Sequence, residues 1–475
     1  MESKNKKKKP GHWDQEYDVV VIGSGFAGLA AAIEAKQSGS SVLVLEKMSI
    51  PGGNSAISGG LLAVAGSPLQ KREGIVDSPE LMFRDMLAAG MGINHPELAQ
   101  VVAEQSPAVL QWTESLGVKY KDYLNHLGGH SVPRTYNTVC GTGFGIFQPM
   151  LTRCRQMDIP IQMKTMFCQL LQVDGTTGGV LTLSDYLINH KDSGTPIRIR
   201  ARRAVILACG GFGSDIPFRQ LQDPRLNEMV DTTNHQGATA ESLIAALRYG
   251  ATPIHLSWIQ LGPWASFDEK GWGVGSMFTM LAGFPFGIMV DAKTGKRFVN
   301  EMSDRRLRTD AMLFSNRVPV AIVDSTGVKY ATTLDACLKR GVVKRFDSIE
   351  ALAHANTIPL PELKETLDKY RLSLAHGHDM EFGRHLSADL QPIENPPFYS
   401  IRLSPKVHHC MGGIQINANA EVISLETRQP IPGLFAAGEI TGGVHGASRL
   451  GSNAIVECIA LGRIAGRKAA HDKSC

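Results

Sequence analysis

The sequence lacks both a cysteine framework and a long apolar segment. Its eight cysteines are widely spaced and form no C-x-x-C pair, which argues against a zinc ribbon, a thioredoxin motif and c-type haem attachment. No run reaches the ~18 apolar residues that a membrane-spanning helix needs. The basic, polar N-terminus has no apolar stretch typical of an export signal. We therefore expect no metal site and no membrane span, with the protein cytoplasmic as written, or periplasmic if a leader has been removed.

A strong charge imbalance is absent as well. The formal net charge is +4 over 475 residues, and residues 6–9 alone supply four lysines. Because the remaining chain is close to neutral, we expect no nucleic-acid partner. The composition, with 43% hydrophobic and 20% charged residues, is that of an ordinary globular protein. At this length the chain is expected to form two domains or one heavily elaborated domain.

Glycine, in contrast, is abundant and clustered: the chain has 49 glycines, above the usual share of about 7%. The first cluster, GSGFAG at 23–28, follows a β-branched run at 17–22 and precedes helix-forming residues up to 37. A second apolar run, 41–45, ends at Glu46. Strand, glycine turn, helix, strand and acid within ~30 residues predict a dinucleotide-binding unit.

Each residue of this unit has an expected role. Gly23 permits the tight turn, Gly25 lets the backbone approach a pyrophosphate, and Gly28 lets the helix pack on the strand. The helix N-terminus faces the phosphates, and Glu46 accepts hydrogen bonds from ribose hydroxyls. FAD and NAD both suit these residues. The candidate cofactor residues here are Gly23, Gly25, Phe26, Ala27, Gly28, Glu46 and Lys47.

Three further glycine segments favour FAD over NAD. One lies at 51–60, directly after the acidic strand end, and the other two follow apolar runs at 203–208 and 433–437. Strand ends of an open α/β sheet meet at one edge, where ligands bind, so one site touched by four distant loops indicates a long cofactor. The additional candidates are Gly53, Asn54, Ser55, Ser58, Gly59, Gly60, Gly210, Gly211, Gly438 and Glu439.

The middle of the chain has a different composition, rich in tryptophan, methionine and phenylalanine, with a predicted helix at 348–375. We interpret it as an inserted domain, after which the chain returns to complete the first domain and ends in a predicted helix at 453–470. The predicted organisation is a disordered tail (1–16), a nucleotide-binding domain (17–256 and 410–475) and an inserted domain (257–409).

Five motifs together resemble one flavoprotein family. They are GSGFAG (23–28), GGNSAISGG (52–60), GKRFVNE (295–301), VHHCMGG (407–413) and GEITGGVHGASRLGSNA (438–454). Along residues 17–470 the chain resembles the fumarate reductase and succinate dehydrogenase flavoproteins, in the soluble branch of flavocytochrome c fumarate reductase and urocanate reductase. The resemblance implies an α/β fold, in which a Rossmann-like FAD-binding domain carries an inserted α+β capping domain that closes over substrate. It also implies that Ser452, Asn453 and Ala454 contact the cofactor.

The resemblance has two implications for the redox chemistry. In the membrane-bound branch a histidine near the GG-x-S segment bonds covalently to flavin, whereas this chain has Asn54 in that motif, which implies non-covalent FAD. We expect this protein to lack the family's haem-bearing N-terminal domain. Electrons are therefore expected from an external donor, which is a cytochrome, a quinol pool or a reduced nicotinamide system.

Reducing a double bond conjugated to a carboxylate requires a hydride, stabilisation of developing negative charge, and a proton. By resemblance, flavin N5 supplies the hydride, Arg449 and His408 bind the carboxylate, and Arg305 is the proton donor. Because a free arginine is essentially never deprotonated, Arg305 must be reprotonated promptly. The competing interpretations are an Arg449 paired with a structural acid and a surface basic cluster of Arg305, Arg306 and Arg308.

The residues that differ from the family are those expected to contact the end of the substrate opposite the carboxylate bound by Arg449 and His408. Fumarate enzymes have Gln-x-His-Pro where this chain has Gly262, and a Thr-Glu pair and an arginine where it has Met280, Leu281 and Phe284. With Trp264, these residues predict an apolar pocket end without a cation. Such a surface offers no ion pair or hydrogen bond to offset the desolvation of a second carboxylate, which costs several kcal/mol. The alternative is that these residues are plain core of the capping domain.

We therefore predict an FAD-dependent oxidoreductase acting on CH–CH bonds that reduces a 2-enoate with one carboxylate, of the acrylate, methacrylate or cinnamate type. Fumarate or urocanate reductase is the first alternative. A 3-ketosteroid dehydrogenase would suit the apolar residues, but a steroid offers no carboxylate to Arg449 and His408. The last alternative, a non-catalytic flavoprotein that only carries electrons, leaves the retention of these residues and Arg305 unexplained.

Overall fold

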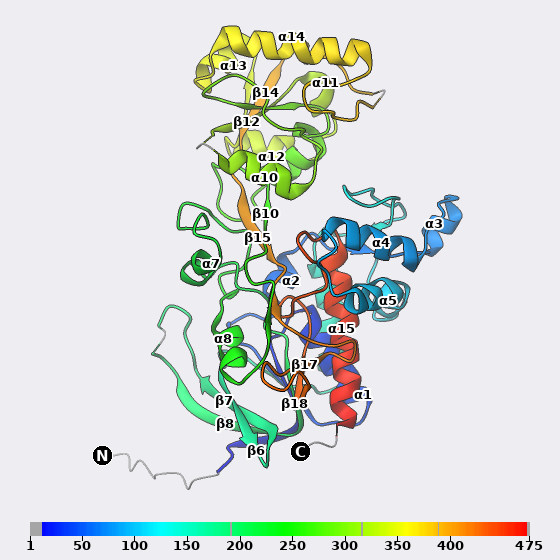
Figure 1. Ribbon diagram of the computed structural model, residues 1–475, viewed down its shortest axis with the longest axis vertical. Helices are drawn as coiled ribbons and strands as arrows, with labels where there is room; N and C mark the ends of the chain where they lie inside the picture. Colours follow the sequence, from blue (N-terminus) through cyan, green and yellow to red (C-terminus); the bar gives the residue numbers. More distant parts are fainter. Residues whose placement is uncertain (1–11, 191, 315–316, 388, 473–475) are drawn as a thin grey trace. The chain divides into compact units, whose positions relative to one another are not determined.

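The computed structural model describes residues 12–190, 192–314, 317–387 and 389–472 (Figure 1). Residues 1–11 of the predicted tail lie outside this range. The chain divides into two compact units. The first comprises Met1–Gln222, His235–Trp258 and Cys410–Cys475, and the second comprises Asp223–Asn234 and Ile259–His409.

One boundary differs from the sequence prediction, which placed residues 223–234 in the nucleotide-binding domain. In the structure this segment belongs to the second unit. Thr232 forms a parallel bridge with Val407, and the Asp231 carboxylate lies 3.1 Å from Lys406 Nζ and accepts the Gly271 N–H at 2.9 Å. These partners lie 40 to 175 residues away along the chain, so the local sequence gives no sign of them.

The first unit is built on an eight-stranded sheet. Strand β1 (Gln15–Ile22) pairs in parallel with β2 (Val42–Leu45) and β8 (Thr195–Leu207), as a doubly wound fold requires,. Strands β6 and β7 extend the sheet as an antiparallel excursion from β8. In spatial order the main path is β17 (Glu421–Ile423), β18 (Pro430–Ala436), β8 (Thr195–Leu207), β1 (Gln15–Ile22), β2 (Val42–Leu45) and β5 (Ile161–Gln162), with β6 (Met166–Val173) and β7 (Thr176–Ser184) beside it.

The predicted strand at 17–22 is confirmed, but it starts earlier than expected. Gln15 is already paired with Ile199 of β8, and the Trp13 ring lies 5.0 Å from the Arg198 guanidinium. Residues 12–16 are thus ordered, which corrects the prediction for that part of the tail. Pairing with β8 and the cation–π contact of Trp13 hold these residues in place,. The polar composition of the segment gave no indication of either contact.

Two long helices pack against each other in this unit: α1 (Phe26–Gln37) and α15 (Asn453–His471), the latter confirming the helix predicted at 453–470 (Figure 1). Their close approach depends on glycine, because a Cβ at Gly462 would lie 2.5 Å from the Ala27 carbonyl oxygen. The remaining elements are α2 (Gly53–Ile57), α3 (Pro68–Arg72), α4 (Pro79–Ala89), α5 (Pro96–Ser115), α6 (Phe144–Gln156), α7 (Ile216–Gln222), α8 (Glu241–Arg248), β3 (Leu61–Ala63), β4 (Thr135–Asn137), β9 (Pro253–Ile254) and β16 (Gly413–Ile414).

The second unit contains an antiparallel four-stranded sheet, in the order β11 (Ile288–Asp291), β12 (Pro319–Val323), β14 (Phe398–Arg402) and β13 (Val343–Phe346), and a pair formed by β10 (Ile259–Gly262) and β15 (Lys406–Cys410). Side chains alternate between two apolar clusters: Met289 packs in one, and Ile288 and Val290 in the other, as the two-residue period of a strand dictates. The helical elements are α9 (Gly275–Phe278), the π-helical turn η1 (Thr279–Gly283), α10 (Arg305–Leu313), α11 (Ser325–Val328), α12 (Leu334–Lys339), α13 (Ile349–Ala355) and α14 (Leu360–His376).

The single helix predicted at 348–375 is in fact two helices, α13 and α14. The break contains Thr357, whose φ is +56°, and Pro359, which cannot continue the preceding helix and disfavours helical geometry at Ile358. Among the helices of the described residues, none has the length and apolar character needed to cross a membrane.

Candidate functional site

The glycine turn between β1 and α1 has the geometry expected of a nucleotide cradle. Gly23 has a φ of +103°, and a Cβ there would lie 2.3 Å from the Ala208 carbonyl oxygen. At Gly28 a Cβ would lie 1.9 Å from the Gly23 carbonyl oxygen. Any side chain at either position would collide with backbone. The turn therefore brings the N-terminus of α1, where orphan N–H groups favour phosphate, close to the sheet edge.

A pocket in the first unit gathers the loops that the sequence separates. It is lined by loops that follow β1, β2, β8 and β18, together with residues from 165–167 and 235–242. The predicted cofactor residues found in its lining are Gly23, Gly25, Phe26, Ala27, Glu46, Lys47, Gly53, Asn54, Ser55, Gly210, Gly438 and Glu439. One elongated ligand can thus contact all four glycine segments.

Other predicted cofactor residues do not line this pocket. They are Gly28, Ser58, Gly59, Gly60, Gly211, Ser452, Asn453 and Ala454. Two of them are spacers next to it, because a Cβ at Gly28 would meet the glycine turn and one at Gly211 would lie 2.5 Å from Glu439 Oε1. For such positions the absence of a side chain matters more than contact with a ligand.

Sequence reasoning missed more than half of the lining. The missed residues are Ile22, Ser24, Leu45, Met48, Gly52, Thr165, Met166, Phe167, Ala208, Cys209, His235, Gly237, Ala238, Glu241, Ser242, Ala437 and Cys458. The polar, glycine-containing stretch before α8 was the available signal for His235 to Ser242. Residues 165–167 form an ordinary strand start and carry no such signal.

Charged side chains at one end of the pocket are held in place by the protein. The Glu46 carboxylate accepts hydrogen bonds from Ser24 Oγ (2.5 Å) and the Met48 N–H (2.9 Å). Lys47 Nζ lies 3.3 Å from the Glu241 carboxylate. Burial alone would raise the pKa of Glu241, but the Lys47 charge and nearby hydrogen bonds bring it below its ordinary value. Glu46, the acid that follows β2, is thus held in the pocket lining, at the position where dinucleotide-binding folds bind a ribose.

Glu439 and Asn54 form a second polar group in the pocket lining. Glu439 Oε1 accepts the Cys410 N–H at 2.9 Å, and burial raises the pKa of Glu439 to about 7 despite this bond and the Arg449 charge. Asn54 Oδ1 accepts the His235 N–H at 2.6 Å. Asn54 is thus fixed by the backbone and offers an amide to the pocket.

The N-terminus of α15 offers a further polar cradle. Ser452 has a φ of +65° and is held by Thr135, whose hydroxyl lies 2.7 Å from Ser452 Oγ. The next residue, Asn453, is fully buried, and neither polar atom of its amide has a hydrogen-bond partner among the described residues. Because buried polar groups are normally paired, this amide and the adjacent helix end fit a polar group of a bound ligand.

Arg449 is the predicted carboxylate-binding residue of this unit. Its side chain is buried, and Nη1 donates to the Leu450 carbonyl oxygen at 3.0 Å. Burial lowers the pKa of Arg449, while the charges of Glu439 and Glu457 oppose this effect. A guanidinium remains cationic under such conditions, so the GASRLGSN loop keeps a positive charge in a low-dielectric setting.

The second unit brings together the other two predicted catalytic residues. Arg305 begins α10, donates from Nη1 to Gln260 Oε1 at 3.2 Å and places its guanidinium 4.6 Å from the Trp264 ring centre. His408, on β15, shares a hydrogen bond of 2.8 Å between Nδ1 and Thr233 Oγ1 and lies edge-on to Trp264 at 5.4 Å. Trp264 thus contacts both residues, which is not the environment of a solvated basic cluster.

The predicted apolar pocket residues are only partly what the sequence suggested. Trp264 and Phe284 belong to a buried cluster of the second unit, Met280 packs against it, and Gly262 is required because a Cβ there would lie 2.9 Å from the Trp264 ring. The expectation of a surface without a cation is wrong at Phe284, because the Arg308 guanidinium lies 4.8 Å from its ring centre. The sequence did not show that α10, which begins at Arg305, supplies this charge.

Comparisons with known proteins agree with this architecture. The family described as FAD binding domain matches residues 18–455. The acrylate reductase flavoprotein subunit of Shewanella woodyi is 45% identical over 96% of this chain and 91% of its own length. A flavocytochrome c3 fumarate reductase in its open conformation has a TM-score of 0.81 and 31% identity, covering 96% of this chain and 78% of that one.

A more distant solved structure covers both chains almost completely. It is a 3-ketosteroid-Δ4-(5α)-dehydrogenase from Rhodococcus jostii RHA1 in complex with 4-androstene-3,17-dione, with a TM-score of 0.76, 25% identity, and 98% and 99% coverage. These matches confirm the predicted resemblance, the α/β fold and FAD as the cofactor. The glycine turn, Glu46 and the unpaired Asn453 amide fit that cofactor.

Acid precipitation of the purified yellow protein is expected to release all of its flavin into the supernatant. The reason is that Asn54, held by the His235 backbone, offers no nucleophilic ring nitrogen to carry a covalent bond. Absorbance and fluorescence of the supernatant and of the washed pellet measure the distribution. Flavin retained in the pellet would contradict the non-covalent prediction.

Proposed function

Because the chain belongs to the FAD-binding domain family, and is an FAD-dependent oxidoreductase, we propose that it reduces the C=C bond of a 2-enoate with a single carboxylate. The substrate class is that of acrylate, methacrylate and cinnamate. The observation that carries the proposal is the 45% identity, along nearly the whole chain, to a protein named for acrylate reduction. The loss of polar side chains at 262, 281 and 284 supports the same preference.

Several residues of the first unit would hold the cofactor. Gly23 and Gly25 would admit the pyrophosphate to the N-terminus of α1, Glu46 would accept from ribose hydroxyls, and the Asn453 amide at the start of α15 would offer its unpartnered polar atoms to the cofactor,. Reduced FAD supplies a hydride equivalent to the substrate. The protein must then bind the carboxylate, stabilise negative charge and deliver a proton.

We assign these tasks to three residues of this chain. Arg449 binds the substrate carboxylate with the paired N–H groups that only arginine offers, and His408, oriented by Thr233, donates to the same carboxylate. Arg305 delivers the proton to the carbon that does not receive the hydride. The contacts with Gln260 and Trp264 restrict the rotamers of Arg305, which reduces the entropy lost when it aligns with substrate.

The electrons are proposed to come from a separate donor. One relative is a flavoprotein subunit by name, which is consistent with a partner that carries electrons to it. A cytochrome, a quinol-linked protein and a reduced nicotinamide system remain the candidate classes. Binding of a small carboxylate and exchange of electrons with a partner are the two interactions that the proposed reaction requires.

An acceptor screen with a reduced viologen dye tests the function. We expect the best of acrylate, methacrylate and cinnamate to exceed fumarate in kcat/KM by about 100-fold. The Arg308 guanidinium at Phe284 is already engaged by the Glu301 carbonyl oxygen and leaves the desolvation of a second carboxylate largely uncompensated. This desolvation costs several kcal/mol, and each 1.4 kcal/mol is tenfold. Anaerobic oxidation of the dye, measured by absorbance, gives the rates. Fumarate or urocanate as the fastest acceptor would contradict the preference.

Two other outcomes would replace the proposal altogether. Turnover of a 3-ketosteroid alone would support the dehydrogenase alternative, which the second structural match makes worth including. A flavin that the dye reduces, but that no organic acceptor reoxidises, would support a protein that only carries electrons. Both outcomes are visible in the same assay, with the protein's own flavin absorbance as the internal signal.

A further inference from the structure

Arg308 lies one helical turn after Arg305 and is held in an unusual position. Its guanidinium stacks on Phe284 at 4.8 Å, and Nη1 donates to the Glu301 carbonyl oxygen at 3.0 Å. The Nε atom is buried and has no hydrogen-bond partner among the residues that the structure describes, while the side chain as a whole is only half-buried. Arg308 thus has one edge in the interior and retains contact with solvent.

The two arginines share one face of α10. Residues three apart on a helix are neighbours, with Cβ atoms about 5–6 Å apart. Arg305 stacks on Trp264 and Arg308 on Phe284, and both aromatic rings belong to the same buried cluster. The helix therefore places both arginines on one face, each with its guanidinium stacked on an aromatic ring of the same apolar cluster.

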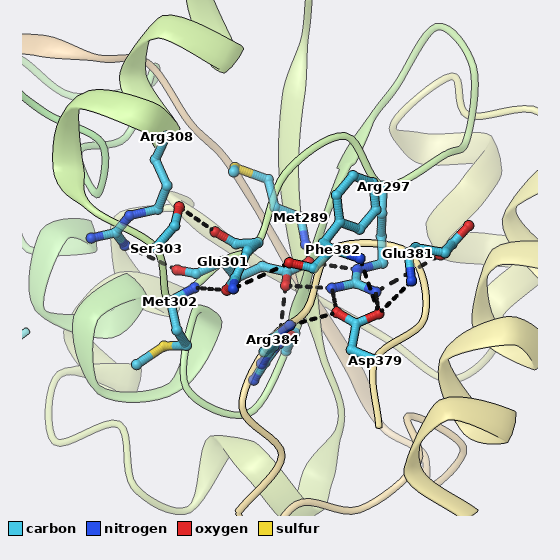
Figure 2. A network of polar contacts seen from close by, with 12 residues as sticks. Met289, Arg297, Glu301, Met302, Ser303, Arg308, Asp379, Glu381, Phe382 and Arg384 are labelled. Atoms are coloured by element: carbon cyan, nitrogen blue, oxygen red, sulfur yellow. Dashed lines mark hydrogen bonds and ion pairs between the residues drawn. The ribbon is translucent and has the colours of Figure 1, made fainter. Parts of the chain in front are cut away.

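The surroundings of Arg308 lower its pKa below the ordinary value of an arginine. Burial lowers its pKa to about 10, and the carboxylates of Asp304 and Glu301 oppose this effect only partly. The Glu301 carboxylate is already engaged by Arg297 (2.8 Å) and Arg384 (3.2 Å). Figure 2 shows Arg308 on one side of Glu301 and these partners of the carboxylate on the other. The Glu301 carboxylate therefore contributes little to holding the proton on Arg308.

An arginine that gives up a proton in each turnover needs a donor that is ready to replace it. The positions that carry a glutamate and an arginine in fumarate enzymes of the family hold Leu281 and Phe284 here, so those side chains provide none. A suitable donor lies on the same helix face as Arg305, has a lowered pKa, and is accessible to solvent. Arg308 meets these three conditions.

We propose that Arg308 returns the proton that Arg305 gives to the substrate; this inference rests on the proposed function. After Arg305 has protonated the substrate carbon it is a neutral guanidine. An N–H proton of the Arg308 guanidinium then moves to it, which restores cationic Arg305 and leaves Arg308 neutral, and Arg308 takes up one proton from solvent. The sequence consumes one solvent proton per product and moves no electrons.

Kinetics of Arg308→Met test the proposal. We expect kcat for the best 2-enoate to fall about 100-fold with KM unchanged, and added guanidinium at millimolar concentration, or more buffer acid at fixed pH, to restore part of the rate. In the wild type, kcat should fall as the pH rises through about 10, where Arg308 loses its proton, and should not depend on buffer concentration. Arg306→Met is the matched control on the same helix and should behave as wild type.

The alternatives give different results. An unchanged kcat in Arg308→Met, or a higher KM at unchanged kcat, would overturn the proposal, the latter because Arg308 would then bind a carboxylate. A lower kcat that neither guanidinium nor buffer acid improves, in a variant with wild-type flavin content and melting temperature, would overturn it too. A wild type that reduces no 2-enoate would refute the proposed function itself, whereas an active wild type with an indistinguishable variant would refute only the role of Arg308.

A second test does not depend on turnover. Phenylglyoxal reacts with the neutral guanidine, so the pH dependence of labelling in the flavin-loaded protein reports the protonation of each arginine. Peptide mass spectrometry should show labelling of Arg308 levelling off above about pH 10, while that of Arg306 continues to rise with pH. Parallel curves for the two residues would contradict an acidified Arg308.

Discussion

Replacing Arg305 by glutamine is expected to lower kcat for 2-enoate reduction by about 10³-fold, within the range typical of a lost general acid. Glutamine keeps hydrogen-bonding capacity towards Gln260 but has no ionisable proton to deliver. Because Arg305 is a half-buried residue at the start of α10, the fold and the flavin content should change little. Steady-state assays with the best acceptor, together with the flavin-to-protein absorbance ratio, measure both effects.

Arg306→Gln is the control for the loss of a positive charge on α10. Its backbone N–H is held by the Asp304 cap at 2.8 Å, which the substitution preserves, so near wild-type turnover is expected. Equal turnover of Arg305→Gln and wild type would remove Arg305 as the proton donor. Loss of flavin from Arg305→Gln would instead indicate a structural role.

The other large effect concerns stability. Arg297→Met is expected to lower the free energy of unfolding by about 3–5 kcal/mol, the cost of removing one partner from a buried ion pair. Arg297 binds Glu301 through two bonds of 2.8 Å and Asp379 through bonds of 2.9 and 3.1 Å, and all three side chains are at most 1% exposed. Without Arg297, two carboxylates remain in the interior; the Arg384 guanidinium still pairs with Glu301, while Asp379 keeps backbone N–H donors such as that of Arg384 (Figure 2).

Urea unfolding followed by circular dichroism measures this loss. Arg345→Met, which removes an exposed pair with Asp347, is the control and should cost less than about 1 kcal/mol. Burial alone would raise the pKa of Asp379, but Arg297 brings it below the ordinary value. The contribution of this pair is therefore fully present above about pH 4 and is lost as the pH falls through the lowered pKa. Equal stabilities of Arg297→Met and Arg345→Met would contradict this account.

The ion-pair network also bears on the proposed chemistry. Glu301 Oε1 accepts the Met289 N–H of β11 at 3.0 Å, and its carbonyl oxygen accepts from Arg308. Glu301 thus connects the sheet of the second unit to the loop that leads into α10. Arg305 and Arg308 are positioned by this connection, so the predicted loss of stability and a loss of activity are expected to occur together in Arg297→Met.

The parts of the fold that were predicted correctly are those with a local physical cause. Only glycine tolerates a φ of +103° at position 23 together with the close approach of Ala208, so the dinucleotide turn is recognisable from the letters alone. The buried strand at 17–22 and the helix at 453–470 were recognised in the same way, from residue type and spacing. A contiguous apolar run predicts burial wherever the rest of the chain goes.

The parts that were missed depend on residues far apart in the sequence. The segment 223–234 joins the second unit through Lys406 and Val407, and the tail residue Trp13 is ordered by Arg198. Residues 165–167 line the cofactor pocket only because the chain leaving β5 passes it. No local pattern distinguishes these residues from others of the same type.

The sequence by itself determined the cofactor class and the residue types of the reaction, because backbone geometry demands glycine at fixed places and carboxylate chemistry demands arginine. Only the tertiary structure decided the environment of those arginines: Arg305 against Trp264, Arg308 against Phe284, and Arg297 between two buried carboxylates. The acidity of a side chain is set by the burial and charges around it, and these come from segments that meet only when the chain has folded.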